Sequence, residues 1–255
     1  MTLQLFAGEL PKYALVFCRI GGMILFNPLL QRRNIPSQLK IALILGITLL
    51  LAPPLTVPEA ANGLALLPAM VAELMVGVAF GFVFQIFYYL LFAAGDIIDM
   101  GFGLSMAKAF DPGTSLQVSV SGNLFQLMFT MYFFATNSHL ILIRVMASSY
   151  DLIGPGLAHV GANAAQFLTT LFTSAFSLAL HLALPFMAAS FFMEIAMGVL
   201  MKLIPQINVF SINFQIKILL GMGLLFLFAG PVSTFLEQYL DTMLKSLPAL
   251  LATMQ

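Results

Sequence analysis

The fold is decided by a stretch that reads Ala196-Met-Gly198-Val-Leu-Met-Lys202-Leu-Ile-Pro205-Gln206-Ile-Asn208-Val-Phe210. Lys, Pro, Gln and Asn stand close together here, and a long apolar run lies on each side. A loop of a water-soluble protein would carry more charge and more glycine, whereas an uninterrupted membrane helix would not contain this group of residues. The pattern predicts backbone that turns or breaks between two helices at membrane depth, where protein or water must satisfy its polar groups.

The composition of the whole chain indicates the same class of protein. The 255 residues are 61% hydrophobic and 8% charged, with a formal net charge of zero, whereas globular domains carry roughly a quarter charged residues. So few charges could not cover the surface of a soluble domain, which leaves a polytopic all-α membrane protein. No large basic cluster is present, which argues against a nucleic-acid partner. The single cysteine, Cys18, excludes an internal disulfide and a cysteine-cluster metal site.

About six apolar runs have a length near the roughly 20 residues that span the hydrocarbon of a bilayer. They are Tyr13–Leu30, Leu39–Leu55, Pro68–Ala94, Gly122–Ser148, Phe167–Leu200 and Val209–Ala229. The fifth is too long for one straight span, and Pro185 predicts a kink in it. The tail, Pro231–Gln255, has the pattern of an amphipathic helix, with Tyr239, Met243 and Leu247 on its apolar face and Glu237, Asp241 and Lys245 opposite.

Basic residues favour alternate loops between these runs. They are Arg32, Arg33 and Lys40 around the first loop, Lys108 in the third and Lys202 in the fifth. The excess of Lys and Arg in cytoplasmic loops therefore places loops one, three and five in the cytoplasm and both termini outside. Arg144, near the outer end of the fourth run, opposes this assignment.

Several segments together resemble a known family. The stretch from Lys202 to Phe210, followed by Lys217 and Gly221, is similar to the signature of FliR, the family of flagellar type III secretion export-gate proteins. Three further segments match the same family: Arg19-Ile-Gly21-Gly22 with Pro28, Pro36 and Lys40; Glu73 to Phe82 with Gly77 and Gly81; and Ala94 to Gly103 with Asp111-Pro112. The resemblance covers nearly the whole chain. One departure is Gln215, because the family often has proline after the phenylalanine that follows the Asn-Val-Phe motif.

The resemblance implies a non-enzymatic function. A FliR-like chain is a subunit of a gate in the bacterial inner membrane, in the flagellar basal body, through which unfolded flagellar subunits pass. Its expected partners are FliP-like and FliQ-like membrane subunits, an FlhB-like subunit at the cytoplasmic entrance, the export substrates and membrane lipid, and no cofactor is expected. The fold that it implies is a FliP-like part, about residues 1–165, joined to a FliQ-like helical hairpin and tail, about residues 166–255, in one helical export-gate domain.

Glu73, Gly77 and Gly81 are spaced by four residues, which places them on one helix face. Small residues at this spacing let two helices approach closely, either within the chain or against a neighbouring subunit. A charge at mid-bilayer costs about 2.5–3.5 kcal/mol on insertion scales, so Glu73 must be paired, protonated or close to water. A proton relay is an alternative function for it.

Other ionisable residues lie in or beside apolar runs, where a charge is a functional hypothesis by default. They are Arg19, Glu194, Lys202 and Lys217. We expect Arg19, Glu194 and Lys217 to form buried ion pairs inside a hetero-oligomer, and Lys202, Pro205, Gln206, Asn208 and Phe210 to form a cytoplasmic turn. Asp96 and Asp99, three residues apart, face water or a basic partner at a helix end, or bind a cation.

The segment from Gly101 to Ser121 mixes flexible glycine, a proline turn and large apolar side chains between two apolar runs. Irregular backbone at membrane depth is tolerated only inside protein or along a cavity. In the FliR-like family the matching region resembles a plug. We therefore expect a pore seal whose residues are Met106, Phe110 and Leu116, with Asp111, Pro112 and Gly113 at the bend.

Two other classes of function remain as alternatives. A small-molecule or ion-coupled secondary transporter would have broken helices in two similar halves, but the halves of this chain do not resemble each other. An intramembrane enzyme would need a catalytic constellation, and no nucleophile motif, zinc motif or P-loop occurs in the sequence.

Overall fold

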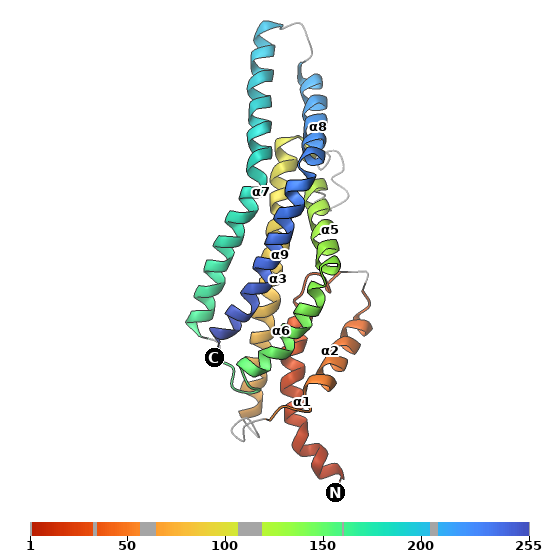
Figure 1. Ribbon diagram of the computed structural model, residues 1–255, viewed down its shortest axis with the longest axis vertical. Helices are drawn as coiled ribbons and strands as arrows, with labels where there is room; N and C mark the ends of the chain where they lie inside the picture. Colours follow the sequence, from red (N-terminus) through yellow and green to blue (C-terminus); the bar gives the residue numbers. More distant parts are fainter. Residues whose placement is uncertain are drawn as a thin grey trace. The chain divides into compact units, whose positions relative to one another are not determined.

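The computed structural model describes residues 2–32, 35–56, 65–106, 119–159, 161–204 and 209–254. Within these ranges the chain is helical and contains no strand, in agreement with the all-α prediction (Figure 1). The elements are α1 (Thr2–Leu25), α2 (Ser37–Leu51), α3 (Leu66–Gly101), the 3₁₀ turn η3 (Leu104–Met106), α5 (Val120–Ala135), α6 (Ser138–Leu152), α7 (Ala162–Leu203), α8 (Val209–Leu227) and α9 (Ala229–Ala252).

The chain forms two compact units, each assembled from separate stretches of sequence. The first contains residues 1–87, 133–173 and 241–255, and the second contains residues 88–132 and 174–240. Three long helices, α3, α7 and α9, therefore each contribute to both units.

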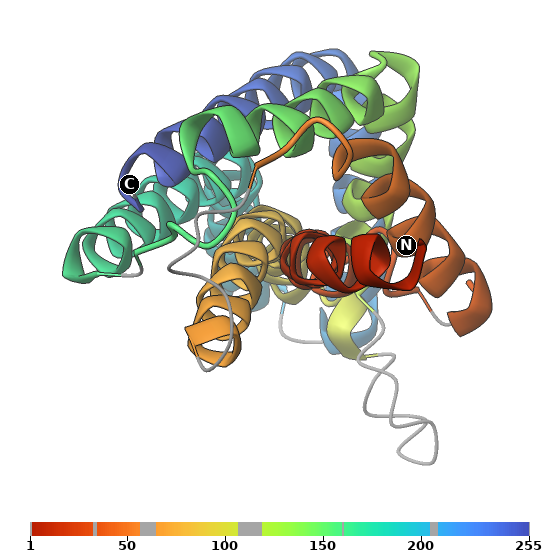
Figure 2. The same ribbon diagram turned by 90° about the horizontal axis from the view of Figure 1, so that it is seen from below.

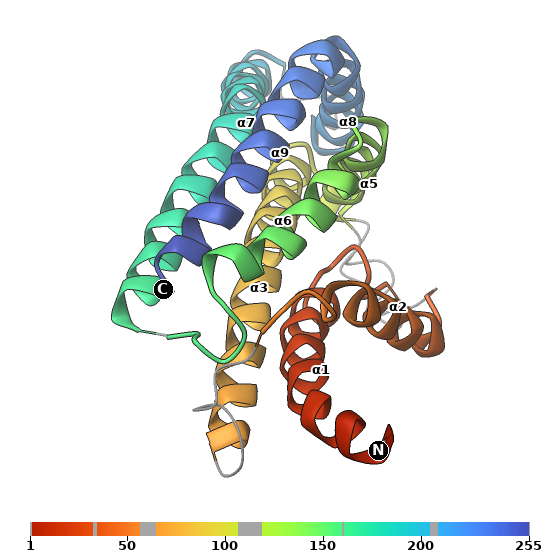
Figure 3. The same cartoon turned by 60° about the horizontal axis from the view of Figure 1, so that its bottom comes forward.

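In the first unit, α1 lies between α2 and the N-terminal half of α3 (Figures 2 and 3). The core of this unit is apolar and aromatic: Leu15, Val16, Ile20 and Met23 of α1 are fully buried. Phe84 stacks edge-on against Phe133 with 6.1 Å between ring centroids. Burial of these large side chains supplies the main stabilisation of the unit.

In the second unit, α7 and α8 run in opposite directions and are joined between Leu203 and Val209 (Figure 1). Phe186 of α7 packs on Phe228, at the end of α8, with a centroid separation of 5.5 Å. A second aromatic group joins α5 to α9, where Phe129 meets Tyr239 at 6.5 Å. The helix break that the polar stretch predicts between Lys202 and Phe210 is confirmed, because α7 ends at Leu203 and α8 begins at Val209.

The fourth apolar run, Gly122–Ser148, is not the single helix that its composition predicts. It is divided into α5 and α6 at Asn137, whose φ of 55° lies in the left-handed region. Among residues other than glycine, asparagine is one of the few that adopt the left-handed conformation readily. The Thr136 and Ser138 hydroxyls bond to each other across the break at 2.8 Å. A short polar group within an apolar run was enough to end one helix and begin another.

Among the described residues, fewer helices than the expected six have membrane length. Within the described residues, α3 and α7 are long and apolar enough to cross a membrane, and α8 with α9 counts as a third crossing if that bent pair, with 62° between its helices, is one span. Helix α2 is apolar but has only 15 residues. Helix α7 continues through Pro185 as one helix of 42 residues.

The amphipathic tail is confirmed as α9. Tyr239, Met243 and Leu247 are buried, whereas Glu237, Asp241 and Lys245 are exposed. The side chains of Asp241 and Lys245 form an ion pair of 2.6 Å, one helical turn apart.

Candidate functional site

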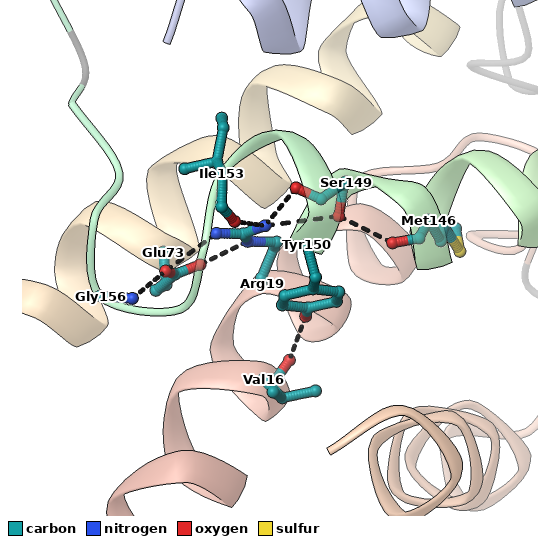
Figure 4. Close-up of polar contacts among 8 residues, drawn as sticks. All are labelled: Val16, Arg19, Glu73, Met146, Ser149, Tyr150, Ile153 and Gly156. Atoms are coloured by element: carbon teal, nitrogen blue, oxygen red, sulfur yellow. Dashed lines mark hydrogen bonds and ion pairs between the residues drawn. The ribbon is translucent and has the colours of Figure 1, made fainter. Parts of the chain in front are cut away.

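Among the described residues, a buried and highly connected polar site is centred on Arg19 of α1, in the first unit (Figure 4). Both Arg19 and Glu73 of α3 are completely buried. Arg19 Nε donates to Glu73 Oε2 at 2.5 Å, and Arg19 Nη2 donates to Glu73 Oε1 at 3.0 Å. This is a bidentate pair, the geometry in which arginine and carboxylate interact most strongly.

The third guanidinium nitrogen of Arg19 binds the end of α6. Its Nη1 donates to the main-chain oxygens of Ser149 and Ile153, at 3.0 and 2.9 Å. The last carbonyl groups of a helix have no partner within the helix and carry partial negative charge, so a cation there is favourable. Arg19 therefore serves as a cap for α6 from another helix.

Two further contacts complete the site. The Tyr150 ring lies 4.3 Å from the Arg19 guanidinium carbon, which is a cation–π geometry. The Gly156 amide donates to Glu73 Oε1 at 2.7 Å, and this fixes the segment after α6. We call the group formed by Arg19, Glu73, Ser149, Tyr150, Ile153 and Gly156 the Arg19 cluster. Its two charges cancel and all three guanidinium nitrogens donate hydrogen bonds, so it is suited to hold segments together.

Close backbone packing of α1 on α3 surrounds this cluster. A Cβ atom on Gly22 would lie 2.8 Å from the Leu74 carbonyl oxygen and 2.8 Å from the Val78 nitrogen. A Cβ atom on Gly77 would collide with the Arg19 carbonyl oxygen, and one on Gly81 would lie 2.5 Å from Phe26 Cβ. The face that carries Glu73, Gly77 and Gly81 is thus turned toward α1 of the same chain.

The second unit has its own buried carboxylate. Asp99, near the end of α3, is 1% exposed and does not face water. Ser119 Oγ donates to Asp99 Oδ2 at 2.7 Å, and the Ser121 amide lies 3.2 Å from both carboxylate oxygens. Asp99 therefore binds the first turn of α5, where free N–H groups favour an anion.

Glu194 of α7 and Lys217 of α8 form an ion pair of 2.7 Å within the second unit. Lys217 is largely covered, but 57% of the Glu194 side chain is exposed. Both this pair and the Arg19–Glu73 pair form inside the chain, whereas the sequence suggested pairing across a hetero-oligomer.

Other expected site residues fall partly outside the described residues. Lys202 is exposed in the last turn of α7, a position where a positive charge is favourable. Pro205, Gln206 and Asn208 and the Phe210 side chain are not described. The same holds for the Met106 side chain and for Phe110, Asp111, Pro112, Gly113 and Leu116.

No group of three or more His, Cys, Asp or Glu side chains that could hold a metal ion occurs in the described ranges. Asp99, one of the two carboxylates at the Asp96–Asp99 spacing, accepts a hydrogen bond from the Ser119 hydroxyl at the start of α5.

Sequence patterns did not reveal the backbone and serine partners of two of the buried charges. Beside Glu73, Arg19 binds the main-chain oxygens of Ser149 and Ile153, and Asp99 binds Ser119 and Ser121. A backbone carbonyl carries no residue-type signal. Serine directly before an apolar run is a recognised helix-start signal, and at Ser119 it could have been used.

Comparisons with known proteins identify the family. The model of the family described as bacterial export proteins, family 1, matches residues 10–243. The flagellar biosynthetic protein FliR of Escherichia coli strain K12 is 28% identical over 86% of this chain and 84% of its own length. FliR of Bacillus subtilis strain 168 is 26% identical over 95% of both chains.

A relative with a different name also matches. The surface presentation of antigens protein SpaR of Shigella flexneri is 25% identical over 85% of this chain and 84% of its own length. The family match covers most of the chain, including the Arg19 cluster, Asp99 and the Glu194–Lys217 pair. This chain therefore belongs to the bacterial export proteins, family 1.

Proposed function

We propose that this protein is a subunit of the flagellar type III protein-export gate in the bacterial inner membrane. It would form, with FliP-like and FliQ-like membrane subunits, the channel through which unfolded flagellar subunits cross, with an FlhB-like subunit at the cytoplasmic entrance. Membership of the export family and the names of the FliR relatives support this assignment. The proposal includes a FliP-like part up to about residue 165 and a FliQ-like hairpin after it, for which the α7–α8 hairpin is consistent support.

The observation that carries the proposal is a mismatch between helix length and exposed apolar surface. Within the second unit alone, residues 174–203 of α7 extend over about 45 Å at 1.5 Å per residue, whereas the hydrocarbon of a bilayer is about 30 Å thick. Only 17% of the most apolar 18-residue stretch of α7 is buried. Phe176, near the start of this part of α7, and Leu203, at its end, are 42% and 72% exposed.

Lipid cannot cover both ends of such a helix at once. If water surrounded the helix ends, large apolar patches would be exposed to it, and the surfaces of soluble proteins rarely carry such patches. The remaining possibility is that other protein covers this apolar surface. In a family of export proteins, that protein would be other membrane subunits. Two open apolar grooves add to the surface that needs a cover: one of about 470 Å³ beside Tyr13, Phe17 and Leu49, and one of about 610 Å³ beside Met100, Met187 and Phe191.

A small-molecule transporter is not supported by this surface. A transporter that functions alone or as a homo-oligomer should fit its apolar helices to the thickness of the bilayer. Helices α3 and α7, with 36 and 42 residues, are longer than that thickness requires.

The pore-seal proposal is kept as part of this function and rests on the family resemblance. Met106, Phe110 and Leu116 would exclude water from the resting channel, since a dry constriction closes by dewetting. Asp111, Pro112 and Gly113 would set the bend, and Pro205, Gln206 and Asn208 would shape the cytoplasmic turn. Deleting part of 106–117 should leave the complex assembled and make the membrane leaky; an assembled complex without a leak would refute the seal.

The experiment that tests the function is deletion of the gene in its own bacterium. The expected result is loss of the flagellar filament and of flagellar subunits from the culture medium, restored by a plasmid copy. Loss of a different set of secreted proteins, with flagella intact, would refute the flagellar assignment and favour the system of the SpaR relative. Normal secretion of both sets would refute the export function.

A further inference from the structure

One face of α6 has a composition that neither water nor lipid alone explains. Leu140, Ile141 and Ile143 are 54%, 42% and 46% exposed, and the charged residues Arg144 and Asp151 are exposed among and beyond them. The opposite side of α6, with Leu142, Val145, Met146 and Ser149, is buried in the first unit. The exposed side is therefore a separate surface, which we call the α6 face and define by Leu140, Ile141, Arg144 and Asp151.

The two charges of the α6 face lie on one line along the helix. Seven residues are close to two turns of an α-helix, so Arg144 and Asp151 point in nearly the same direction about 10 Å apart along the axis. Within the part of the chain that the structure describes, neither side chain makes a hydrogen bond or an ion pair. Asp151 stands in the last turn of α6, where the helix end is itself partially negative and a further carboxylate is unfavourable. The cation that caps this end, Arg19, is already paired with Glu73.

We infer that the α6 face is the docking surface for one helix of another gate subunit, and that this helix carries a carboxylate opposite Arg144 and a basic side chain opposite Asp151. The inference rests on the proposed function, because it needs a gate built from several subunits. An apolar centre with arginine is the composition of a protein interface. Opposite charges at two levels fix the register of the partner helix and reject one shifted by a turn.

If lipid covers the α6 face instead of a partner helix, the expected effect of replacing Arg144 is different. A face that meets acyl chains would gain from loss of the charge, so Arg144→Leu should be neutral or favourable. A face that meets a carboxylate would lose the pair and leave the partner's charge buried alone, which is strongly unfavourable. Arg144→Leu therefore separates the two kinds of cover.

The experiment uses the full complex in its own membrane. A photo-reactive amino acid at Leu140 is activated, and the adduct is mapped by mass spectrometry to a position in a named gate subunit. We expect the adduct on an apolar helix that has Asp or Glu within about one turn of the mapped position. We expect Arg144→Leu and Arg144→Asp to lower the adduct yield at least about tenfold, the factor that 1.4 kcal/mol represents. Arg144→Lys should lower it less.

The matched control is Lys245→Asp, a charge reversal at an exposed lysine of α9 whose partner, Asp241, is in the same chain. It should leave the adduct at the level of the unchanged protein. The charge swap combines Arg144→Asp with lysine in place of the partner's mapped acidic residue. This combination should restore the adduct yield. Each adduct yield is divided by the amount of that variant in the membrane, which is measured by immunoblot.

Two results would overturn the inference. One is an adduct with lipid only, or with a helix that lacks a nearby carboxylate. The other is an unchanged adduct yield in Arg144→Leu. If the unchanged chain fails to copurify with any gate subunit, the proposed function fails instead. Copurification that persists while the Leu140 adduct is unaffected by Arg144 refutes only the role of this face.

Discussion

Arg19 connects three helices and one connecting segment through a single side chain. Its guanidinium pairs with Glu73 of α3, and its remaining donors bind the end of α6. Glu73 in turn holds the Gly156 amide. Both charges are fully buried, so each depends on the other for its solvation. At the scale of the residue, the site orders the chain.

Replacement of Arg19 should therefore destabilise the protein strongly. Arg19→Ala leaves the Glu73 carboxylate buried without its cation, which costs about 3–5 kcal/mol when one member of such a pair is removed. The midpoint of thermal unfolding of the purified complex, and the amount of chain in the membrane, should both fall. Lysine at position 19 should recover little, because it cannot reproduce the fork of donors.

The pairing itself is tested by a double change. Arg19→Leu with Glu73→Leu removes both charges and should be less destabilising than the sum of the two single changes. Lys245→Ala on the exposed Asp241–Lys245 pair is the control and should have almost no effect. Additive effects of Arg19 and Glu73 would contradict the role of the pair.

At the scale of the element, the close approach of α1 and α3 depends on glycine. The two neighbouring residues Gly21 and Gly22 have opposite surroundings: a Cβ at Gly21 would meet nothing within 4 Å, whereas one at Gly22 would meet the α3 backbone at 2.8 Å. Backbone cannot move aside as a flexible side chain can. The helices would have to separate, and the Arg19 cluster would separate with them.

Gly22→Ala should therefore lower the unfolding temperature of the complex, whereas Gly21→Ala should not. In a helix interior, alanine is favoured over glycine by about 1 kcal/mol, so Gly21→Ala should be neutral or slightly stabilising. A cysteine pair across α1 and α3 would report the separation as lower disulfide yield in Gly22→Ala. Equal behaviour of the two variants would contradict the backbone contact.

The break between α5 and α6 is another property of an element. Asn137 adopts the left-handed conformation, which costs most side chains roughly 1–2 kcal/mol. Asn137→Gly should be tolerated, and Asn137→Val should destabilise, as measured by the amount of folded chain per membrane fraction. Stabilisation by valine would indicate one continuous helix across this position.

The start of α5 depends on Asp99. Asp99→Ala removes the acceptor of the Ser119 hydroxyl and the Ser121 amide. Amide hydrogen exchange should become faster in the first turn of α5 and remain unchanged around Phe129, near the middle of that helix. Uniform change along α5, or none, would show that Asp99 does not fix this helix start.

At the scale of the whole molecule, the sequence predicted the class, the helical fold and the family, but not the number of spans. Apolar composition alone does not distinguish a crossing helix from a shorter one, as α2 and the α5–α6 pair show. The amphipathic tail was predictable because its faces alternate in a regular way. The contacts of Arg19 with Ser149 and Ile153 were not, because backbone carbonyl groups of a distant segment carry no residue-type signal.

Polar residues within apolar runs suggest that partner subunits satisfy unpaired polar groups. The structure indicates a different cause for association, which is exposed apolar surface. Most buried polar side chains of the described residues find partners inside the chain, and the exceptions are the side-chain atoms Ser105 Oγ, Ser121 Oγ, His139 Nδ1 and Asn213 Oδ1. What remains uncovered is apolar: Phe192, Leu219 and Phe226 are 70%, 71% and 86% exposed. Under the proposed function, partner helices would cover hydrocarbon surface more than they would satisfy polar groups.

The central claim is that other membrane subunits cover this surface, and native mass spectrometry of the tagged chain extracted from its own membrane tests it most directly. The expected spectrum contains one discrete assembly, much heavier than the 27.7-kDa chain, which releases at least two other kinds of membrane protein when activated. A stable monomer of 27.7 kDa, or an assembly of this chain alone, would contradict the account.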